Sequence, residues 1–300
     1  MSERARAILC SAIVYIVWGS SYVVTSIGVH ALPPRLFSGV RFTVSGIILL
    51  TMARLLGRGP VLGRAELRHG LVMGICSVAL SNGFNNWAMQ WVPSNQAALL
   101  NASTSLWIAG FGAFGARAHA LTSRVVVGLA LGFSGVALIL WPGHALDTTH
   151  LVPQAGILIG CISWSLGTIY FRNVGTRLDI LAFTGLQMLI GGIILAIAGV
   201  AFGETARWSW SAHGLAAMAY LTVFSSCIAY LAFAWLARHV PPAQAGTYGY
   251  VNPAIATLLG WLVLGERLSP GQIVGMVVIL VGVVLVTWPR APRQASAARP

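Results

Sequence analysis

Amide side chains recur at helical spacing inside one long apolar stretch of the chain. Asn82, Asn85, Asn86 and Gln90 follow the spacing i, i+3, i+4 and i+8, which places them on one face of a helix. Each amide offers both donors and acceptors, and polar atoms within a bilayer need partners. We therefore predict that the three asparagines line a cavity; the alternative is hydrogen bonding between helices.

Other apolar stretches carry comparable polar and aromatic faces. The aromatic rings could form cavity walls and stack on a planar or cationic ligand, although tryptophans at stretch ends fit an interfacial belt. Trp18 and Trp164 lie near the middle of their stretches, which favours the cavity. The further candidate substrate-binding residues are Trp18, Ser21, Tyr22, Asn101, Ser105, Trp107, Trp164, Thr168, Tyr230, Tyr248 and Asn252.

Arg41 is the only charged residue well inside an apolar stretch. Its guanidinium could bind a substrate carboxylate through two hydrogen bonds, extend toward the interface, or bond carbonyls at a helix end. Extension to the interface and bonding of carbonyls are the favoured roles, and Arg41 is also a candidate binding residue. Pro253 frees the carbonyl of Gly249, so these two residues are a candidate hinge.

Several chemistries are excluded or disfavoured by the residue types. The chain has no lysine, which excludes a P-loop lysine and a Schiff base. The sequence Gly132–Gly135 has the GxSG form of an intramembrane serine protease, but every histidine lies at a stretch end or in a loop. No metal-ligand cluster is present, so no metal or cofactor is expected. No acid lies in mid-membrane, which favours a facilitator or exchanger.

The composition identifies the elements that carry these residues. Of 300 residues, 57% are apolar and 8% are charged, and the mean hydropathy is +0.81. A soluble domain carries roughly 25% charged residues. We predict an all-α polytopic membrane protein with ten transmembrane helices. The predicted spans are Ile8–Val29, Arg35–Leu56, Gly70–Val92, Asn95–Ala116, Val125–Trp141, Gln154–Phe171, Ile180–Gly203, Gly214–Ala237, Pro242–Gly265 and Gly271–Trp288.

The arginines predict the orientation. Most of them fall on one side of the membrane if the N-terminus is cytoplasmic, and an even number of spans then makes the C-terminus cytoplasmic too. The net charge of +12 comes from single arginines between apolar stretches, so a bilayer is the expected partner and nucleic acid is not. Residue usage rich in Arg, Ala and Gly suggests the inner membrane of a GC-rich bacterium.

The chain repeats itself at a nearly constant spacing. Trp18 matches Trp164, Arg41 matches Gln187, and Gly46 matches Gly192. We predict a first five-helix repeat over 1–148, a second over 149–289, and a cytoplasmic tail over 290–300. Because five is odd, the second repeat would enter the membrane from the opposite face. Inverted repeats are typical of transporters that work by alternating access.

Several motifs resemble the drug/metabolite transporter superfamily, EamA type. They are Trp18-Gly19-Ser20-Ser21, Leu32-Pro33-Pro34 through Arg41-Phe42, Trp164-Ser165-Leu166-Gly167-Thr168, and Asn252-Pro253 with Leu264-Gly265-Glu266-Arg267-Leu268. The first half departs from this pattern with Gly115-Ala116-Arg117, which makes a capping or packing role more plausible for Glu266.

The resemblance implies a ten-helix exporter whose central cavity is lined by the first four helices of each repeat. We expect a small, amphipathic metabolite as substrate, amino acids and aromatic ones among them, and a monomer. An intramembrane enzyme and a channel are the alternatives.

Overall fold

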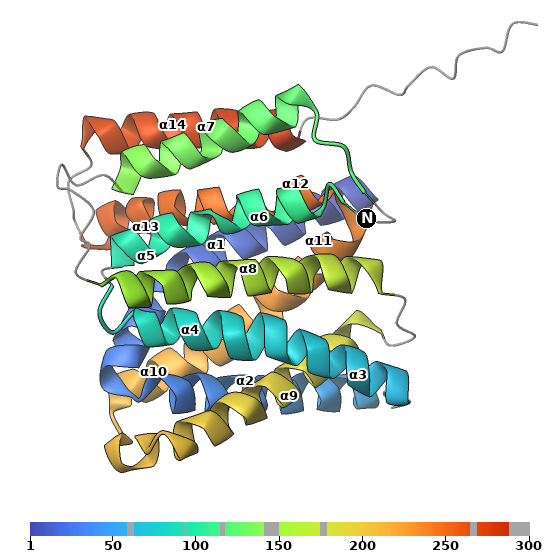
Figure 1. The fold of residues 1–300 in the computed structure, drawn as a ribbon, viewed down its shortest axis with the longest axis vertical. Coiled ribbons are helices and arrows are strands. Elements are labelled where there is room, and N and C mark those ends of the chain that lie inside the picture. Colours follow the sequence, from blue (N-terminus) through green and yellow to red (C-terminus); the bar gives the residue numbers. More distant parts are fainter. Residues whose placement is uncertain are drawn as a thin grey trace, which may run out of the picture.

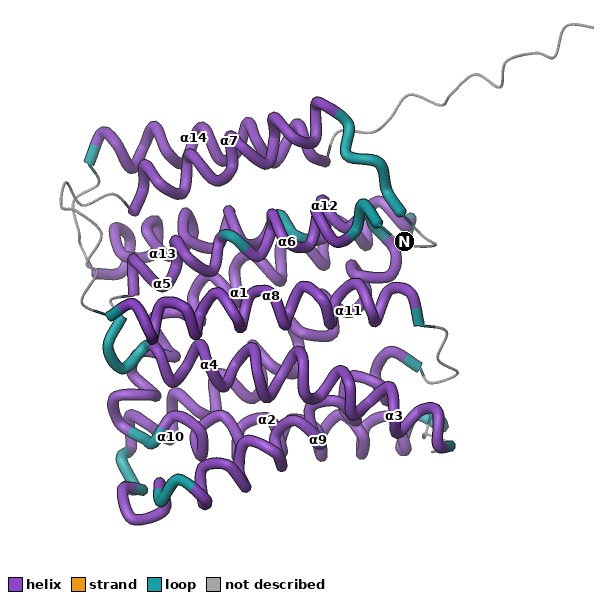
Figure 2. The backbone as a smooth tube through the Cα atoms, viewed as in Figure 1, coloured by secondary structure: helices purple, strands orange, loops and turns teal. Residues whose placement is uncertain are grey.

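The computed structural model describes residues 1–58, 63–92, 94–114, 118–140, 150–174, 179–264 and 269–287, which form helices and short connections (Figures 1 and 2). The first half contains α1 (Glu3–Ala31), α2 (Pro34–Leu55), α3 (Arg64–Met73), α4 (Ser81–Ala88), α5 (Ser94–Ala102), α6 (Thr104–Phe111) and α7 (Ser123–Leu140). The second half contains α8 (Leu151–Asn173), α9 (Ile180–Ala201), α10 (Ala212–Tyr220), α11 (Tyr230–His239), α12 (Pro242–Ala245), α13 (Tyr248–Leu264) and α14 (Pro270–Thr287).

These helices form ten passes, five in each half. Two passes contain a π-helical segment at equivalent places: Gly74–Leu80 joins α3 to α4, and Leu221–Ala229 joins α10 to α11. Two further passes are interrupted helices, α5 with α6 and α12 with α13, whose parts lie in line in Figure 1. The all-helical fold with ten passes is therefore confirmed. Six of the described helical segments are long and apolar enough to cross a membrane by themselves.

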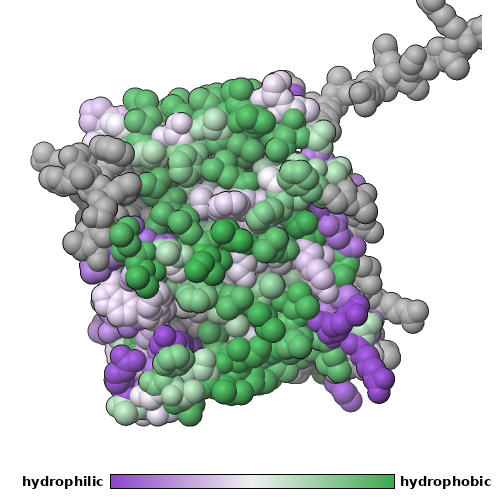
Figure 3. Space-filling model, in the orientation of Figure 1, coloured by the Kyte–Doolittle hydropathy of each residue, from purple (hydrophilic) through white to green (hydrophobic). Residues whose placement is uncertain are grey.

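The surface matches a bilayer environment. Apolar side chains cover the middle of the face in Figure 3, and hydrophilic side chains gather toward the two ends of the helices. Large apolar residues such as Ile16, Ile197 and Val277 are exposed on this surface, at 57%, 63% and 55%. In water such exposure would favour aggregation, whereas lipid tails solvate it.

Glycines bring the equivalent helices α2 and α9 into direct backbone contact. A Cβ on Gly39 would lie 2.5 Å from the backbone N of Ala196, and one on Gly46 would lie 2.5 Å from that of Leu189. The partner residue number falls as the α2 number rises, so the two helices are antiparallel. Since α2 and α9 match in the repeat, their opposite directions show that the two halves are inverted.

The helices α7 and α14 repeat this arrangement at the opposite edge of the bundle (Figure 1). Gly128 faces the carbonyl of Gly282, and Gly135 faces that of Gly275, so these equivalent helices are also antiparallel. The halves share one more detail, because Gly57 and Gly203 both adopt positive φ, at 68° and 71°, just after α2 and α9. Glycine adopts this left-handed conformation without a steric penalty.

The interruptions inside two passes were not predicted from the sequence. The break between α5 and α6 occurs at Ser103, whose hydroxyl donates to Leu100 O at 2.6 Å. The break between α12 and α13 occurs at Gly246–Thr247, where the Thr247 hydroxyl donates to Gln244 O at 2.8 Å. Such hydroxyls compete with the helical hydrogen bonds of the backbone.

Some predicted features lie outside the described residues. They are the boundary between the repeats at 148/149, the tail 290–300, and the two Arg-containing motifs at Gly115–Arg117 and Gly265–Leu268.

Candidate functional site

A cavity of about 140 Å³ lies between the two halves, lined by side chains from both. Its walls come from α1, α2, α4, α5 and α6 of the first half, and from α8, the π-helical segment Leu221–Ala229, α11 and α13 of the second. No described residue of α7 or α14 lines it, as expected for supporting helices. No described residue of α9 lines it either, although the family resemblance implied that the first four helices of each half would.

Most predicted binding residues meet at this cavity. It is lined by Trp18, Ser21, Tyr22, Arg41, Asn82, Asn85, Asn86, Asn101, Trp164, Tyr230, Tyr248 and Asn252. The structure adds further lining residues that were not among the candidates: Thr25, Phe42, Ser81, Met89, Thr104, Cys161, Ser225 and Ser226. These residues lie close in sequence to the candidates, as Phe42 follows Arg41 and Cys161 lies three residues before Trp164. Helical spacing alone does not separate such lining residues from packing residues.

Three predicted residues lie elsewhere. Ser105 is fully buried and donates to Gly246 O at 2.6 Å, and Thr168 donates to Trp164 O of its own helix at 2.9 Å. Trp107 is 37% exposed and stacks on Phe111 with ring centroids 5.7 Å apart. The two hydroxyls are therefore occupied by backbone carbonyls, and Trp107 faces outward, so none of the three lines the cavity.

Aromatic rings from both halves form one wall of the cavity. Trp18 contacts its repeat equivalent Trp164 edge-on at a centroid distance of 5.6 Å, and each ring also packs on Tyr230. The Trp18 indole N–H donates to Ser225 O at 3.2 Å, which fixes the ring between the halves. This wall presents ring surface that can pack against an apolar or planar group.

The amide residues divide into two groups. Asn86 is 2% exposed and donates to the Ser38 hydroxyl at 2.6 Å, which ties α4 to α2. Asn85 and Asn101 instead bond each other, from Asn101 Nδ2 to Asn85 Oδ1 at 2.8 Å, at the cavity wall. Asn85 and Asn101 thus offer amide groups to the cavity, while Asn86 serves mainly the packing of α4.

Arg41 places a guanidinium inside the bundle with weak compensation. It is 4% exposed, its NH2 donates to Asn82 Oδ1 at 3.4 Å, and its centre lies 4.2 Å from the Phe42 ring centroid. Its Nε is buried without a hydrogen-bond partner. Among the described residues, no carboxylate lies within ion-pair distance of it. The side chain therefore does not extend to the interface.

The candidate hinge residues lie within a continuous helix. The structure places Gly249 and Pro253 inside α13, whereas the helical pass is interrupted at Gly246–Thr247. A Cβ on Gly249 would lie 2.5 Å from the Ser105 hydroxyl, so this glycine permits close contact with α6. A hinge role for Gly249 and Pro253 stays a prediction.

Contacts between the halves close the end of the bundle that carries the N-terminus. Tyr15 of α1 and Thr247 share a hydrogen bond of 2.6 Å between their hydroxyls. Arg172 of α8 donates to the carbonyls of Ala237 and Val240 within the second half, and its NH2 lies 3.3 Å from Nε2 of His119 in the first half. The α1 residues that line the cavity, from Trp18 to Thr25, lie beyond this closure, in the second half of that helix.

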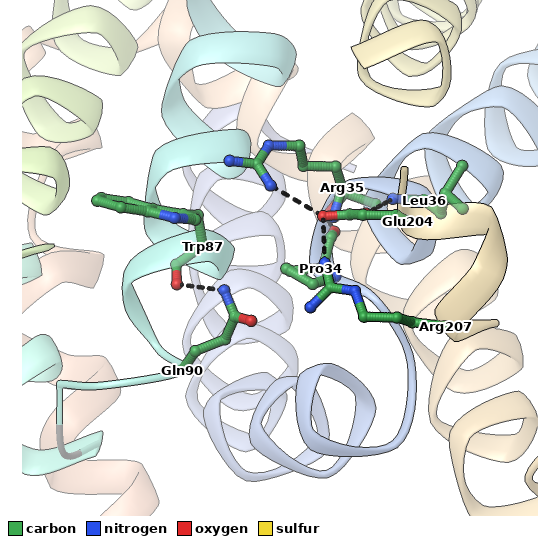
Figure 4. A network of polar contacts seen from close by, with 8 residues as sticks. Pro34, Arg35, Leu36, Trp87, Gln90, Glu204 and Arg207 are labelled. Atoms are coloured by element: carbon green, nitrogen blue, oxygen red, sulfur yellow. Dashed lines mark hydrogen bonds and ion pairs between the residues drawn. The ribbon is translucent and has the colours of Figure 1, made fainter. Parts of the chain in front are cut away.

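A buried carboxylate fixes the other end (Figure 4). Glu204, in the short 3₁₀ helix Glu204–Arg207, is fully buried and accepts the backbone N–H groups of Arg35 and Leu36 at 3.0 and 2.9 Å. It also pairs with the guanidinium of Arg35 at 2.9 Å. A residue of the second half thus caps the N-terminus of α2, which carries partial positive charge.

The described residues contain no group of three or more His, Cys, Asp or Glu side chains that could hold a metal. Ser134, of the GxSG sequence, lies on the exposed face of α7, away from the cavity.

Comparison with known proteins identifies the family. Residues 5–141 and 154–288 each match the EamA-like transporter family. The chain belongs to the EamA-like transporter family. It is therefore a membrane transporter of the drug/metabolite transporter superfamily with two EamA domains, and it is not an enzyme, so the protease alternative is set aside.

Similar proteins cover nearly the whole chain. An uncharacterized inner membrane transporter, YedA of Escherichia coli strain K12, is 38% identical over 91% of this chain and 88% of its own. An uncharacterized transporter, YvbV of Bacillus subtilis strain 168, is 24% identical over 98% and 95%. A solved crystal structure 21% identical to this EamA protein superposes with a TM-score of 0.78, over 94% and 97% of the two chains, which supports the fold.

Proposed function

We propose that this transporter exports small amphipathic metabolites, amino acids and aromatic ones among them, by alternating access of its two inverted halves. The observation that carries the proposal is the cavity shared by the halves, with an aromatic wall around Trp18 and Trp164 and the amides of Asn85 and Asn101. Rings can hold an apolar side chain, and amides can hold polar ends of the same solute.

The proposed orientation has both termini in the cytoplasm of a bacterium. The distribution of arginines supports this orientation. The similar protein YedA is described as an inner membrane transporter, which supports the same membrane for this chain. The contacts of Tyr15 with Thr247 and of Arg172 with His119 would then form a cytoplasmic closure, and the cavity would lie toward the outer side. Reporter fusions to the C-terminus that are active only in the cytoplasm test the orientation.

Counterflow with purified protein in liposomes tests the transport mechanism. Vesicles loaded with one unlabelled metabolite of a panel are expected to accumulate the labelled form transiently, with saturable rates. A channel instead gives linear flux without counterflow. If no metabolite of the panel, which includes the twenty amino acids, shows counterflow, the proposed function is wrong.

A pair of tryptophan substitutions links the assay to the cavity. Trp164→Ala removes a ring of the aromatic wall and is expected to lower counterflow about tenfold. A tenfold change corresponds to a loss of roughly 1.4 kcal/mol of binding free energy for the solute. Trp107→Ala removes a ring outside the cavity and should leave the rate within about twofold of the native one. Equal effects of both substitutions would contradict the assignment of the cavity.

A further inference from the structure

We infer that Arg41 binds a carboxylate of the transported solute, so that the solute is an anion or a zwitterion and not a simple cation. This inference rests on the proposed function and narrows its substrate class. The solute's carboxylate would lie at the guanidinium and its apolar part against the wall around Trp18 and Trp164, since these side chains line the same cavity.

The buried charge of Arg41 is incompletely compensated by its neighbours. A guanidinium has five N–H donors in a planar fork that matches a carboxylate. Arg41 forms one long hydrogen bond of 3.4 Å to Asn82 and lies over the ring of Phe42. Its buried Nε has no hydrogen-bond partner. An unpaired charge inside a membrane protein is costly and marks a functional position. A solute carboxylate in the cavity supplies the missing counter-charge.

The repeat places a neutral residue at the position that matches Arg41. The position equivalent to Arg41 in the second half is Gln187, which is 1% exposed on α9 and does not line the cavity. A neutral side chain is therefore compatible with this helix position in the same fold. The positive charge is specific to the half whose residue faces the cavity, which a purely structural role does not explain.

Arg41 gives the described lining of the cavity a net positive charge. Apart from Arg41, its polar lining consists of amides, hydroxyls, indoles and a thiol, and no described carboxylate lines it. Ser226 Oγ and Asn252 Oδ1 are buried there without partners, so neutral hydrogen-bonding atoms from the second half face the same space. A cation in this cavity would be repelled by Arg41, whereas a carboxylate would be attracted.

Matched pairs of carboxylates and amides test the inference in proteoliposomes. The probes are L-phenylalanine with L-phenylalaninamide, L-leucine with L-leucinamide, and 3-phenylpropanoate with 3-phenylpropanamide. At least one carboxylate is expected to show counterflow at a rate about tenfold or more above that of its amide, because the charge-assisted bonds to Arg41 are lost in the amide.

Variants of Arg41 then locate the effect. R41Q, which introduces the side chain of the equivalent position, should lower carboxylate counterflow about tenfold or more and bring each pair to similar rates. R41K keeps the charge without the fork and should give intermediate rates. Melting temperature and elution volume in detergent show whether each variant is folded. Because the comparison of pairs in the native protein needs no variant, a misfolded R41Q does not remove the test.

Three results overturn the inference: equal rates for carboxylate and amide in the native protein, an unchanged preference in folded R41Q, or counterflow of only neutral or cationic metabolites from the wider panel. In each case saturable counterflow still supports a carrier. Absence of counterflow for every panel compound overturns the proposed function itself, and the inference with it.

Discussion

At the scale of single residues, the contact between Trp18 and Trp164 shows how the repeat creates the centre of the molecule. The two residues are equivalent in the two halves, and their rings touch at a centroid distance of 5.6 Å. Two equivalent positions can contact each other only near the axis that relates the halves. The aromatic wall is therefore built at the place where both halves contribute the same residue.

Neighbouring asparagines of α4 should behave differently when replaced. Asn85→Ala is expected to lower transport about tenfold without changing stability, because its amide faces the cavity and, among the described residues, bonds only Asn101 and, weakly, Met89. Asn86→Ala removes the buried bond to Ser38 and should lower stability by about 1–3 kcal/mol. Counterflow and thermal melting in detergent measure the two effects. Loss of stability in Asn85→Ala with full transport would contradict this division.

The buried carboxylate of Glu204 should contribute to stability. Glu204→Gln weakens the capping of α2 and the pair with Arg35, and is expected to lower stability by about 1.5–3 kcal/mol. Asp179→Asn is the matched control, because the Asp179 carboxylate also accepts a backbone N–H at the start of a helix, α9, but its ion pair with Arg58 is exposed. Asparagine still caps a helix, so this control should cost less than about 1 kcal/mol. A smaller loss for Glu204→Gln than for Asp179→Asn contradicts the account.

Residue spacing predicted much of the cavity lining but not the partners of each side chain. The helical faces of Asn82, Asn85 and Trp164 point to the cavity as expected. Ser105 does not, because it bonds the free carbonyl of Gly246 at a helix break that the sequence did not reveal. The bond from Asn86 to Ser38 joins two passes, and spacing along one helix contains no information about such a contact.

At the scale of elements, the pairing of α2 with α9 forms a rigid edge of the bundle. The described glycines of these helices allow the two backbones to touch along most of their length. Close approach through small residues is the usual way in which helices associate within membranes.

A methyl group in this contact should be costly. Gly46→Ala would place a Cβ 2.5 Å from the backbone N of Leu189, and we expect a loss of stability of about 1–3 kcal/mol. Gly110→Ala in α6 is the control, because nothing lies within 4 Å of its Cβ position, and alanine should be neutral or slightly stabilising there. Thermal melting in detergent compares the two variants. Equal melting temperatures would show that the helices do not pack in this register.

The sequence predicted which helices span the membrane, but it did not predict where these helices are interrupted. Long apolar stretches indicate spans by composition alone, and ten passes were found where ten were predicted. The breaks at Ser103 and Thr247 occur where a hydroxyl bonds a backbone carbonyl. The π-helical segment Gly74–Leu80 lies against α9 of the other half, where a Cβ on Gly191 would lie 2.5 Å from Gly74 O. Ser and Thr hydroxyls also occur inside uninterrupted helices, so residue type alone did not reveal where the helices break.

At the scale of the whole molecule, the odd number of spans in each repeat predicted the inversion, and the antiparallel pairs α2 with α9 and α7 with α14 confirm it. Because the halves are inverted, equivalent residues lie toward opposite ends of the bundle, and there they have different partners. Tyr15 closes one end through a hydrogen bond to Thr247, whereas its equivalent Cys161 makes long sulfur contacts to Leu100 O and Asn101 Oδ1, at 3.7 and 3.6 Å. An exchange between these two arrangements is what the proposed alternating access requires.

Transport between the inverted halves requires that the space between them is a water-accessible path and that the outer surface of the helices faces lipid. Adjacent residues of one pass test it directly. Ser81 lines the cavity, whereas Leu80 is 38% exposed on the outer surface. Single cysteines would be placed at each position, after the four native cysteines, all free, are replaced by alanine. We expect a charged, water-soluble thiol reagent to modify Ser81→Cys in intact membranes and to leave Leu80→Cys unmodified. Modification of Leu80→Cys with protection of Ser81→Cys would contradict it.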